Sequence, residues 1–181
     1  MKTVISIFCT LLLIGIFTPG CEKGLLDVKF ESDFVANLDA NVAGKSLEKS
    51  VAQTFTFTTS DIVDPLTDPE VNKYKDKIKD VSLTKISAEI TSISKSVNLV
   101  SGKLKVTSTG FTSAEWNFTN QTLQVGSILS IGNETGQITN VQNMLNSLNP
   151  ITVTLSGDTD QGNVQFTLKV TFNTEITANP L

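Results

Sequence analysis

The stretch at residues 164–172 reads VQFTLKVTF, and apolar and polar side chains alternate along it without a fault. Successive side chains of a β-strand point to opposite faces of a sheet, so this period of two predicts a strand with one buried and one wet face. Residues 157–162 before it are rich in Gly and Asp, which are typical of turns, and residues 151–155 alternate as well. We therefore predict a β-hairpin over residues 151–172.

The same period of two extends over most of the chain. Apolar residues occupy the even positions from Val28 to Val42, with Ser32 as the only polar break, which predicts one long strand. Between residues 81 and 90 the apolar positions shift from odd to even, and this shift predicts a β-bulge near Thr84 and Lys85. The remaining predicted strands cover residues 51–58, 104–106, 114–118 and 123–125.

Two segments have the spacing of short helices instead. Asp68 and Pro69 are suited to the N-cap and first position of a helix, and they precede apolar residues at helical spacing over 71–81. A second apolar stripe at residues 141–148 follows Thr139 or Asn140 as N-cap and stops before a proline. Each helix has one apolar side, so we expect each to cover an end or a face of the sheets.

About eight strands and two short helices favour a mostly β fold for residues 26–181, as a single two-sheet antiparallel β-sandwich of immunoglobulin-like type. A small barrel is the main alternative. A shift of 70 residues superimposes the apolar pattern of residues 71–83 on that of 141–153, which would fit two copies of a helix-to-strand unit. Chance coincidence of apolar patterns is the simpler interpretation, because this period exceeds the usual repeat lengths.

The N-terminus has the pattern of a signal peptide. Lys2 supplies a positive charge, and a nearly unbroken apolar run covers residues 4–17, which is shorter than the roughly 20 residues that span a membrane. Pro19 and Gly20 then end the run before Cys21. A small residue followed by Cys directly after such a run resembles the lipobox of bacterial lipoproteins, although Thr18 stands where Leu is usual.

This resemblance implies that residues 1–20 are removed and that residues 21–25 form a tether lipidated at Cys21. The charged residues Glu22 and Lys23 resemble the export tags of surface-exposed lipoproteins of the Bacteroidota. The implied location is the cell envelope, anchored by lipid at the outer membrane and exposed at the cell surface. Ordinary secretion with a leftover thiol is the alternative, but the sequence has no Ala-x-Ala cleavage site.

Composition excludes several function classes. All 14 basic residues are Lys and the net charge is -4, which argues against nucleic-acid binding because such proteins use a basic face rich in Arg. The chain has no His, which eliminates Ser-His-Asp and Cys-His catalysis and the common zinc motifs. Its two Cys are Cys9, in the leader, and Cys21, so no disulfide is expected in the mature domain.

Four carboxylates lie within ten residues, at Asp61, Asp64, Asp68 and Glu70, in what we expect to be a loop before the first helix. Calcium prefers such oxygen-rich loops, so these residues are a candidate calcium site, although the spacing lacks the alternation of an EF-hand. The simpler interpretation is that Asp68 caps the helix, Glu70 interacts with the helix dipole and the others form turns.

Aromatic side chains offer a second kind of candidate site, because they stack on sugar rings. Trp116 shares the parity of Ala114 and Phe118, which favours a core position, whereas Phe111 is expected at the surface and Tyr74 on the buried side of its helix. The residues expected on a wet outer face are rich in Thr and Asn, namely Thr54, Thr56, Thr58, Asn117 and Thr119.

No motif specifies a reaction, and no cofactor is expected beyond the candidate calcium. The sequence favours a non-enzymatic lipoprotein that binds a protein or glycan partner or has a structural role. One alternative is a hydrolase such as a glycosidase, which would need two carboxylates about 5–10 Å apart in a cleft. Another is a lipid-binding sandwich, which would need an empty apolar cavity.

Overall fold

The computed structural model describes residues 27–44 and 54–179, and strands dominate them. The strands are β1 (Val28–Val42), β2 (Phe55–Val63), β3 (Ile78–Ile93), β4 (Val97–Thr107), β5 (Ala114–Leu123), β6 (Ile128–Leu129), β7 (Ile151–Thr159) and β8 (Val164–Ala178). A 3-10 helix (Pro65–Thr67) and the short helix α1 (Pro69–Tyr74) follow β2, and α2 (Gln137–Asn146) precedes β7.

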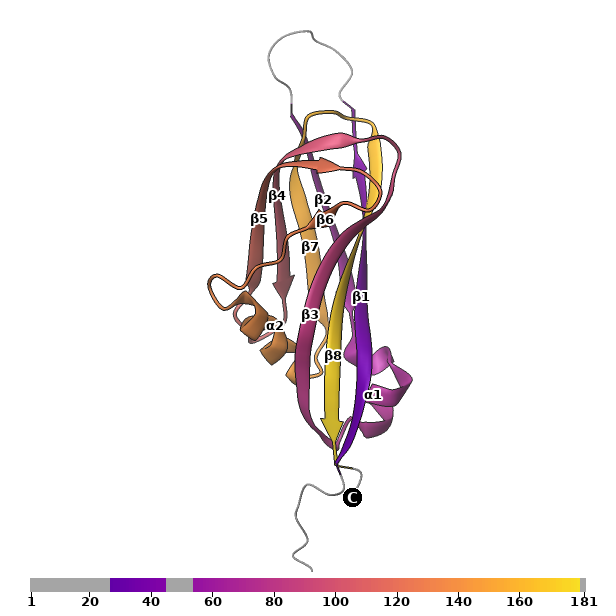
Figure 1. Cartoon of the computed structure of the whole chain (residues 1–181), viewed down its shortest axis with the longest axis vertical. Helices are drawn as coiled ribbons and strands as arrows, with labels where there is room; N and C mark the ends of the chain where they lie inside the picture. Colours follow the sequence, from indigo (N-terminus) through magenta and orange to yellow (C-terminus); the bar gives the residue numbers. More distant parts are fainter. Residues whose placement is uncertain (1–26, 45–53, 180–181) are drawn as a thin grey trace, which may run out of the picture.

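The strands form two antiparallel sheets that pack face to face (Figure 1). Sheet A has the order β1-β8-β3-β6, and sheet B has the order β2-β7-β4-β5. All fifteen residues of β1 pair in register with β8, as their uninterrupted alternation requires. The prediction of a mostly β, two-sheet sandwich is therefore confirmed.

The space between the sheets is filled by the inward side chains of both. The largest fully buried side chains include Phe172 and Leu38 from sheet A and Leu104 and Leu155 from sheet B. Phe57 and Phe166 meet edge to face across the sandwich, with ring centroids 5.2 Å apart, which is a favourable geometry for aromatic rings. The described interior is thus a packed core, and it gives no support to the lipid-binding alternative.

The predicted hairpin over residues 151–172 is wrong, although its turn is placed well. β7 pairs with β2 and β4 in sheet B, whereas β8 pairs with β1 and β3 in sheet A. The turn therefore carries the chain from one sheet to the other. It is held by two hydrogen bonds to β4, because Asp160 N–H donates to the Asn98 carbonyl and Asn98 N–H donates to Asp160 Oδ1.

The first helix is shorter than its apolar spacing predicts. It ends at Tyr74, and Ile78 is the first residue of β3 instead of part of the helix. The predicted β-bulge is confirmed, because the pairing of β3 with β8 shifts between Leu83 and Lys85. Two further shifts occur in β3, one of them between Ile90 and Ser92.

Other boundaries differ from the predictions. β5 is one strand that continues to Leu123, and Val125 lies exposed in the following turn instead of in a strand of its own. Helix α2 begins at Gln137, after Gly136, so neither Thr139 nor Asn140 is its N-cap. The strands that follow α1 and α2 belong to different sheets, so the two helix-to-strand segments do not occupy equivalent places.

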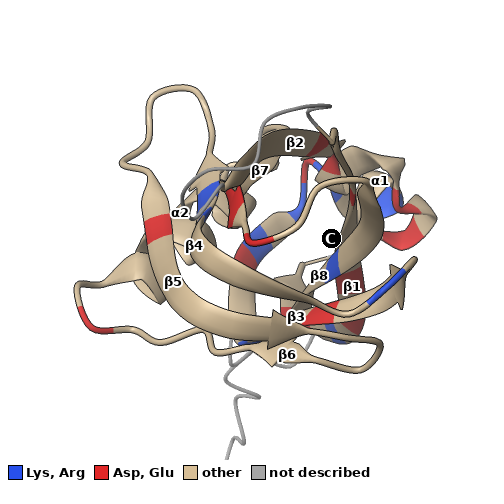
Figure 2. Cartoon of the chain, turned by 90° about the horizontal axis from the view of Figure 1, so that it is seen from above, with Lys and Arg blue, Asp and Glu red and all other residues tan. Residues whose placement is uncertain are grey.

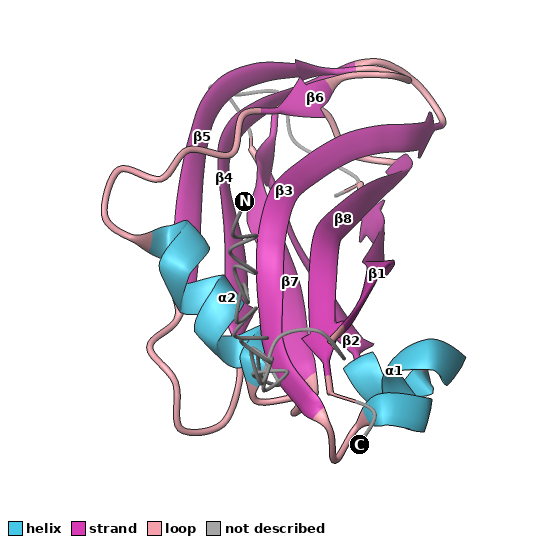
Figure 3. Cartoon of the chain, turned by 60° about the horizontal axis from the view of Figure 1, so that its bottom comes forward, coloured by secondary structure: helices cyan, strands magenta, loops and turns pink. Residues whose placement is uncertain are grey.

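Helix α2 closes the gap between the open edges of β3 and β5, on the opposite side of the sandwich from α1 (Figure 3). Asn146 Oδ1 accepts a hydrogen bond from Val81 N–H at 2.6 Å, and Asn140 Nδ2 donates to the Ser113 carbonyl at 3.3 Å. These amide groups satisfy backbone atoms that a sheet edge would leave open. Three residues of the apolar stripe of α2, Val141, Met144 and Leu145, are fully buried.

The sandwich has two distinct poles. β1 begins and β8 ends at the lower end of Figure 1, where Val28 pairs with Ala178, and we call this end the tether pole. The connections from β5 to β6 and from β7 to β8 lie at the upper end of Figure 1, which we call the distal pole. Seen along this long axis, basic and acidic positions are interspersed around the sandwich (Figure 2).

Candidate functional site

The four predicted calcium ligands each have protein partners of their own. Asp61 lies in β2 and not in a loop, and its carboxylate accepts hydrogen bonds from Asn37 N–H of β1 at 2.9 Å and from Ile62 N–H at 2.8 Å. It therefore links the neighbouring edges of the two sheets. Asp64 Oδ1 accepts from Leu66 N–H at 2.9 Å and caps the 3-10 helix.

Asp68 is the N-cap of α1, as predicted. Its Oδ1 accepts from the N–H groups of Glu70 at 2.8 Å and Val71 at 3.1 Å, and its Oδ2 accepts from Ser32 Oγ at 2.7 Å. Burial alone would raise the pKa of Asp68, but the hydrogen bonds from Ser32, Val71 and Glu70 outweigh it and lower the pKa. The carboxylate is thus held ionised by donors of the protein itself.

Glu70 completes the cluster at the surface, 3.6 Å from Lys73 in an exposed ion pair. In the two described segments, no group of three or more His, Cys, Asp or Glu residues is placed to hold a metal ion. The structure does not bring the four carboxylates together around a common point, so it gives no support to a calcium site there. Cys21 lies outside the described residues.

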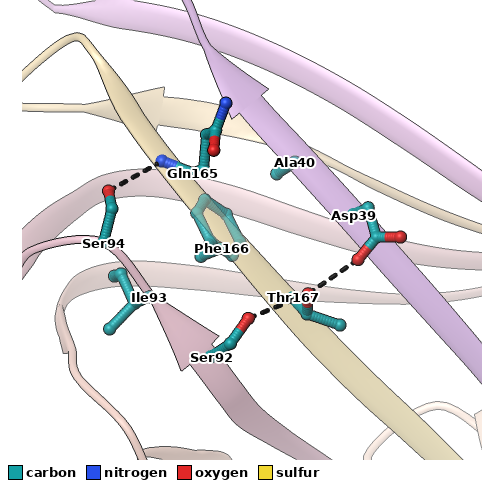
Figure 4. Close-up of a pocket in the computed structure, with 8 residues that line it drawn as sticks. All are labelled: Asp39, Ala40, Ser92, Ile93, Ser94, Gln165, Phe166 and Thr167. Carbon is teal, nitrogen blue, oxygen red and sulfur yellow. Dashed lines mark hydrogen bonds between the residues drawn. The ribbon is translucent and has the colours of Figure 1, made fainter.

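Sheet A instead has a shallow depression of about 450 Å³ on its outer face, towards the distal pole (Figure 4). Asp39 of β1, Thr167 of β8 and Ser92 of β3 form a row across three strands. Ser92 Oγ donates to Thr167 Oγ1 at 3.0 Å, and Thr167 Oγ1 donates to Asp39 Oδ1 at 2.6 Å. We call this depression the Asp39 site.

A β-bulge creates the row at the Asp39 site. Ile90 of β3 pairs with Leu168 of β8, and after the shift Ser92 pairs with Thr167. Without the extra residue, Ser92 would pair with Phe166 and point into the core, because a shift of one residue reverses the face of a strand. The bulge therefore turns Ser92 outwards, beside Thr167.

Sheet B has a depression of the same volume, about 450 Å³, on its own outer face. Asp158 of β7 lies between two hydroxyl groups on neighbouring strands. Thr56 Oγ1 of β2 donates to Asp158 Oδ1 at 2.7 Å, and Ser101 Oγ of β4 donates to Asp158 Oδ2 at 2.9 Å. Here too a bulge, between Leu99 and Ser101, brings the serine opposite the aspartate. We call this depression the Asp158 site.

A third depression, of about 390 Å³, lies between β5 and the segment that follows β6, and Glu115 and Glu134 both line it. Lys105 and Lys103, at 3.0 and 3.1 Å, hydrogen-bond to the Glu115 carboxylate and lower its pKa. A glycosidase needs one carboxylic acid whose pKa is raised so that it can donate a proton. The environment of Glu115 has the opposite effect.

The aromatic residues lie where the sequence predicts. Trp116 is 5% exposed, and its indole N–H donates to the Gly132 carbonyl at 2.7 Å, whereas Phe111 is 37% exposed. Tyr74 packs against Phe30 of β1 with ring centroids 5.7 Å apart. The predicted polar outer face is also confirmed, because its five Thr and Asn residues are all exposed.

Sequence reasoning missed both the Asp39 and the Asp158 sites. The sequence places Asp158 in a predicted turn, Asp39 and Thr167 at polar positions of predicted strands, and Ser92 just beyond the strand predicted up to residue 90. The period of two indicates the outward orientation of Asp39 and Thr167, but not that of Ser92, which only the bulge turns outwards. No signal exists for their adjacency, because it depends on strand order and on bulges.

No protein-family model, curated protein or solved structure matches this chain. None of the helices in the described segments has both the length and the apolar character needed to span a membrane. The site must therefore be interpreted from its own chemistry.

Proposed function

We propose that this protein is a lipid-anchored lipoprotein of the bacterial cell envelope whose β-sandwich is a non-catalytic binding module. The main observation behind this proposal is that the start of β1 and the two candidate sites lie towards opposite ends of the sandwich. The leader and Cys21 precede a strand that begins at the tether pole, and the Asp39 and Asp158 sites both lie towards the distal pole.

The dimensions of the fold fit this arrangement. Only six peptide units separate Cys21 from Asp27, so the tether spans at most about 20 Å. From Val28, strand β1 rises for eleven residues to Asp39, which corresponds to about 36 Å. A lipid on Cys21 would hold the tether pole near the membrane and present both sites well above it.

The chemistry of the two sites supports binding over catalysis. At the Asp39 site the proton of Ser92 goes to Thr167 and the proton of Thr167 goes to Asp39. A serine nucleophile needs a neighbouring base that titrates near neutral pH, and a threonine hydroxyl is no such base. Fixed hydroxyl and carboxylate groups on a rigid sheet instead suit the recognition of a polar partner.

Fractionation of cells tests the anchor. Wild type is compared with Cys21→Ala and with the matched control Cys9→Ala, whose thiol lies in the leader. We expect wild type and Cys9→Ala in the membrane fraction and Cys21→Ala in the soluble fraction of the envelope or the medium. Release of all three variants, or retention of Cys21→Ala in the membrane, would contradict the proposal.

A further inference from the structure

We infer that the Asp39 and Asp158 sites bind neutral glycans, through sugar hydroxyl groups that donate to the two carboxylates. This inference rests on the proposed binding function and names its ligand class. The first observation behind it is that hydroxyl groups in both sites already use their protons in hydrogen bonds within the protein. It also rests on the parallel construction of the sites in the two sheets.

The hydroxyl protons of Thr56 and Ser101, the two groups bonded to Asp158, are both committed. Thr58, Thr119 and Ser156 also line this depression. A Ser or Thr hydroxyl has one proton and two lone pairs. Thr56 and Ser101 each give that proton to Asp158, so the atoms they turn towards a ligand are acceptors, as are the remaining lone pairs of the carboxylate. A ligand at this point must therefore supply hydrogen-bond donors.

The Asp39 site has the same character. The chain from Ser92 through Thr167 consumes both hydroxyl protons, and Asp39 keeps Oδ2 for a further donor. The Ser94 hydroxyl, which accepts from Gln165 N–H at 3.1 Å, and the side-chain amide of Gln165 line the same depression and add donor groups. Sugar hydroxyl groups both donate and accept, so they match a surface that combines the carboxylate acceptors with such donors.

Charge narrows the ligand class further. A carboxylate at the centre of each site repels phosphate, sulfate and other anions. At the Asp158 site, Lys103 lines the same depression and disfavours an ammonium group there. Neutral hydroxyl donors are the ligand chemistry that both sites accept.

The duplication of the construction argues that it serves more than local stability. In each sheet a β-bulge places a serine beside an aspartate row, at Ser92 in β3 and at Ser101 in β4. The two sites lie on the outer faces of sheets that pack against each other, so they face in opposite directions. Each has about 450 Å³, within the range of about 300–1,000 Å³ usual for small-molecule sites. One molecule could therefore contact two sugar chains.

The test is a titration followed by amide chemical shifts in ¹⁵N-labelled protein. The chain from Glu22 onwards contains every described residue and carries no lipid, so the result is independent of the anchor. Glucose, galactose, mannose and N-acetylglucosamine are the probes, each added in turn. We expect at least one of them to produce saturable shifts at Ser92 and Thr167, at Thr56 and Ser101, or at both pairs.

Three variants locate the binding. Asp39→Asn and Asp158→Asn each replace a carboxylate by an amide, and each should raise the dissociation constant at its own site about tenfold, since hydrogen bonds to charged groups are the stronger ones. The matched control is Asp33→Asn, on the same outer face of sheet A, where Asp33 accepts from Asn173 Nδ2 at 2.7 Å. This control should leave binding unchanged.

Two results would overturn the inference. The first is the absence of saturable shifts with all four sugars. The second is saturable binding that neither Asp39→Asn nor Asp158→Asn weakens, because the ligand would then lie elsewhere. A variant whose spectrum shows loss of the fold is replaced by Thr167→Val or Ser101→Ala, which remove a hydroxyl and keep the carboxylate.

Discussion

Substitution of Asp68 by Ala should destabilise the sandwich more than the loss of an ordinary N-cap does. The reason is that this one carboxylate bonds both to α1 and to Ser32 of β1. Its Oδ1 caps α1 through two N–H groups, and an N-cap contributes about 1 kcal/mol. Its Oδ2 accepts from Ser32, which is only 6% exposed, and a hydrogen bond to a charged group contributes about 1.5–3 kcal/mol. The sum predicts a loss of about 2.5–4 kcal/mol.

Urea denaturation followed by the fluorescence of the single Trp, Trp116, measures this loss. The midpoint should fall while the slope of the transition stays the same. Asp64→Ala is the matched control, because Asp64 caps only the 3-10 helix, and it should lose about 1 kcal/mol or less. Equal losses in the two variants would refute the reasoning that Asp68 joins α1 to β1.

The pH dependence supplies a second check on Asp68. Its pKa is lowered in the folded protein, so its contribution is fully present above the unfolded value of about 3.9 and is lost as the pH falls through the lower, folded value. The stability difference between wild type and Asp68→Asn should therefore shrink below about pH 4. A difference that stays constant down to pH 2 would contradict this assignment.

Gly157→Ala should lower the melting temperature sharply, because its Cβ would lie 2.3 Å from the Ser101 carbonyl oxygen, and overpacking of this kind costs about 1–3 kcal/mol. Gly132→Ala is the control and should be nearly neutral, since its Cβ would meet nothing closer than 3.8 Å; equal effects would contradict the close approach of β7 and β4. Asn146→Ala should cost about 1 kcal/mol in chemical denaturation by leaving Val81 N–H without its acceptor, and an unchanged midpoint would show that α2 does not hold the edge of β3. Calcium should not raise the melting temperature, because the carboxylates of residues 61–70 already have protein donors; a rise that grows with calcium concentration would restore the calcium site.

Strands were predictable from the sequence wherever one face is buried along their whole length. β1 has this pattern from Ser32 to Val42, and the parity shift near Thr84 located a real bulge in β3. β8 continues six residues beyond its predicted end at Phe172, because the next inward residue is the polar Thr174. That residue is buried nevertheless, since its hydroxyl donates to the Ser32 carbonyl at 2.7 Å.

Pairing was not predictable, and the supposed hairpin shows why. Turn residues specify that the chain reverses, but they do not specify whether the two strands share a sheet. Here the reversal at residues 160–163 crosses between sheets and is fixed by long-range bonds, including one from Gly44 N–H to Asn163 Oδ1. Such partners are far apart in sequence, so no local pattern shows them.

The candidate sites depend on this same missing information. Asp158 and Ser101 are 57 residues apart, and Asp39 and Thr167 are 128 residues apart. Their adjacency follows from strand order together with one-residue bulges in β3 and β4. The acidic cluster at residues 61–70, by contrast, was visible in the sequence, but its carboxylates turned out to serve caps and a sheet edge.

Mass spectrometry of the N-terminal peptide, isolated from native membranes, tests the central claim most directly. We expect a peptide that begins at Cys21 and carries the mass of its acyl chains, and we expect no such peptide from membranes of the Cys21→Ala variant. A peptide that begins elsewhere, or an unmodified Cys21, would contradict the claim that this sandwich is held at the membrane by lipid.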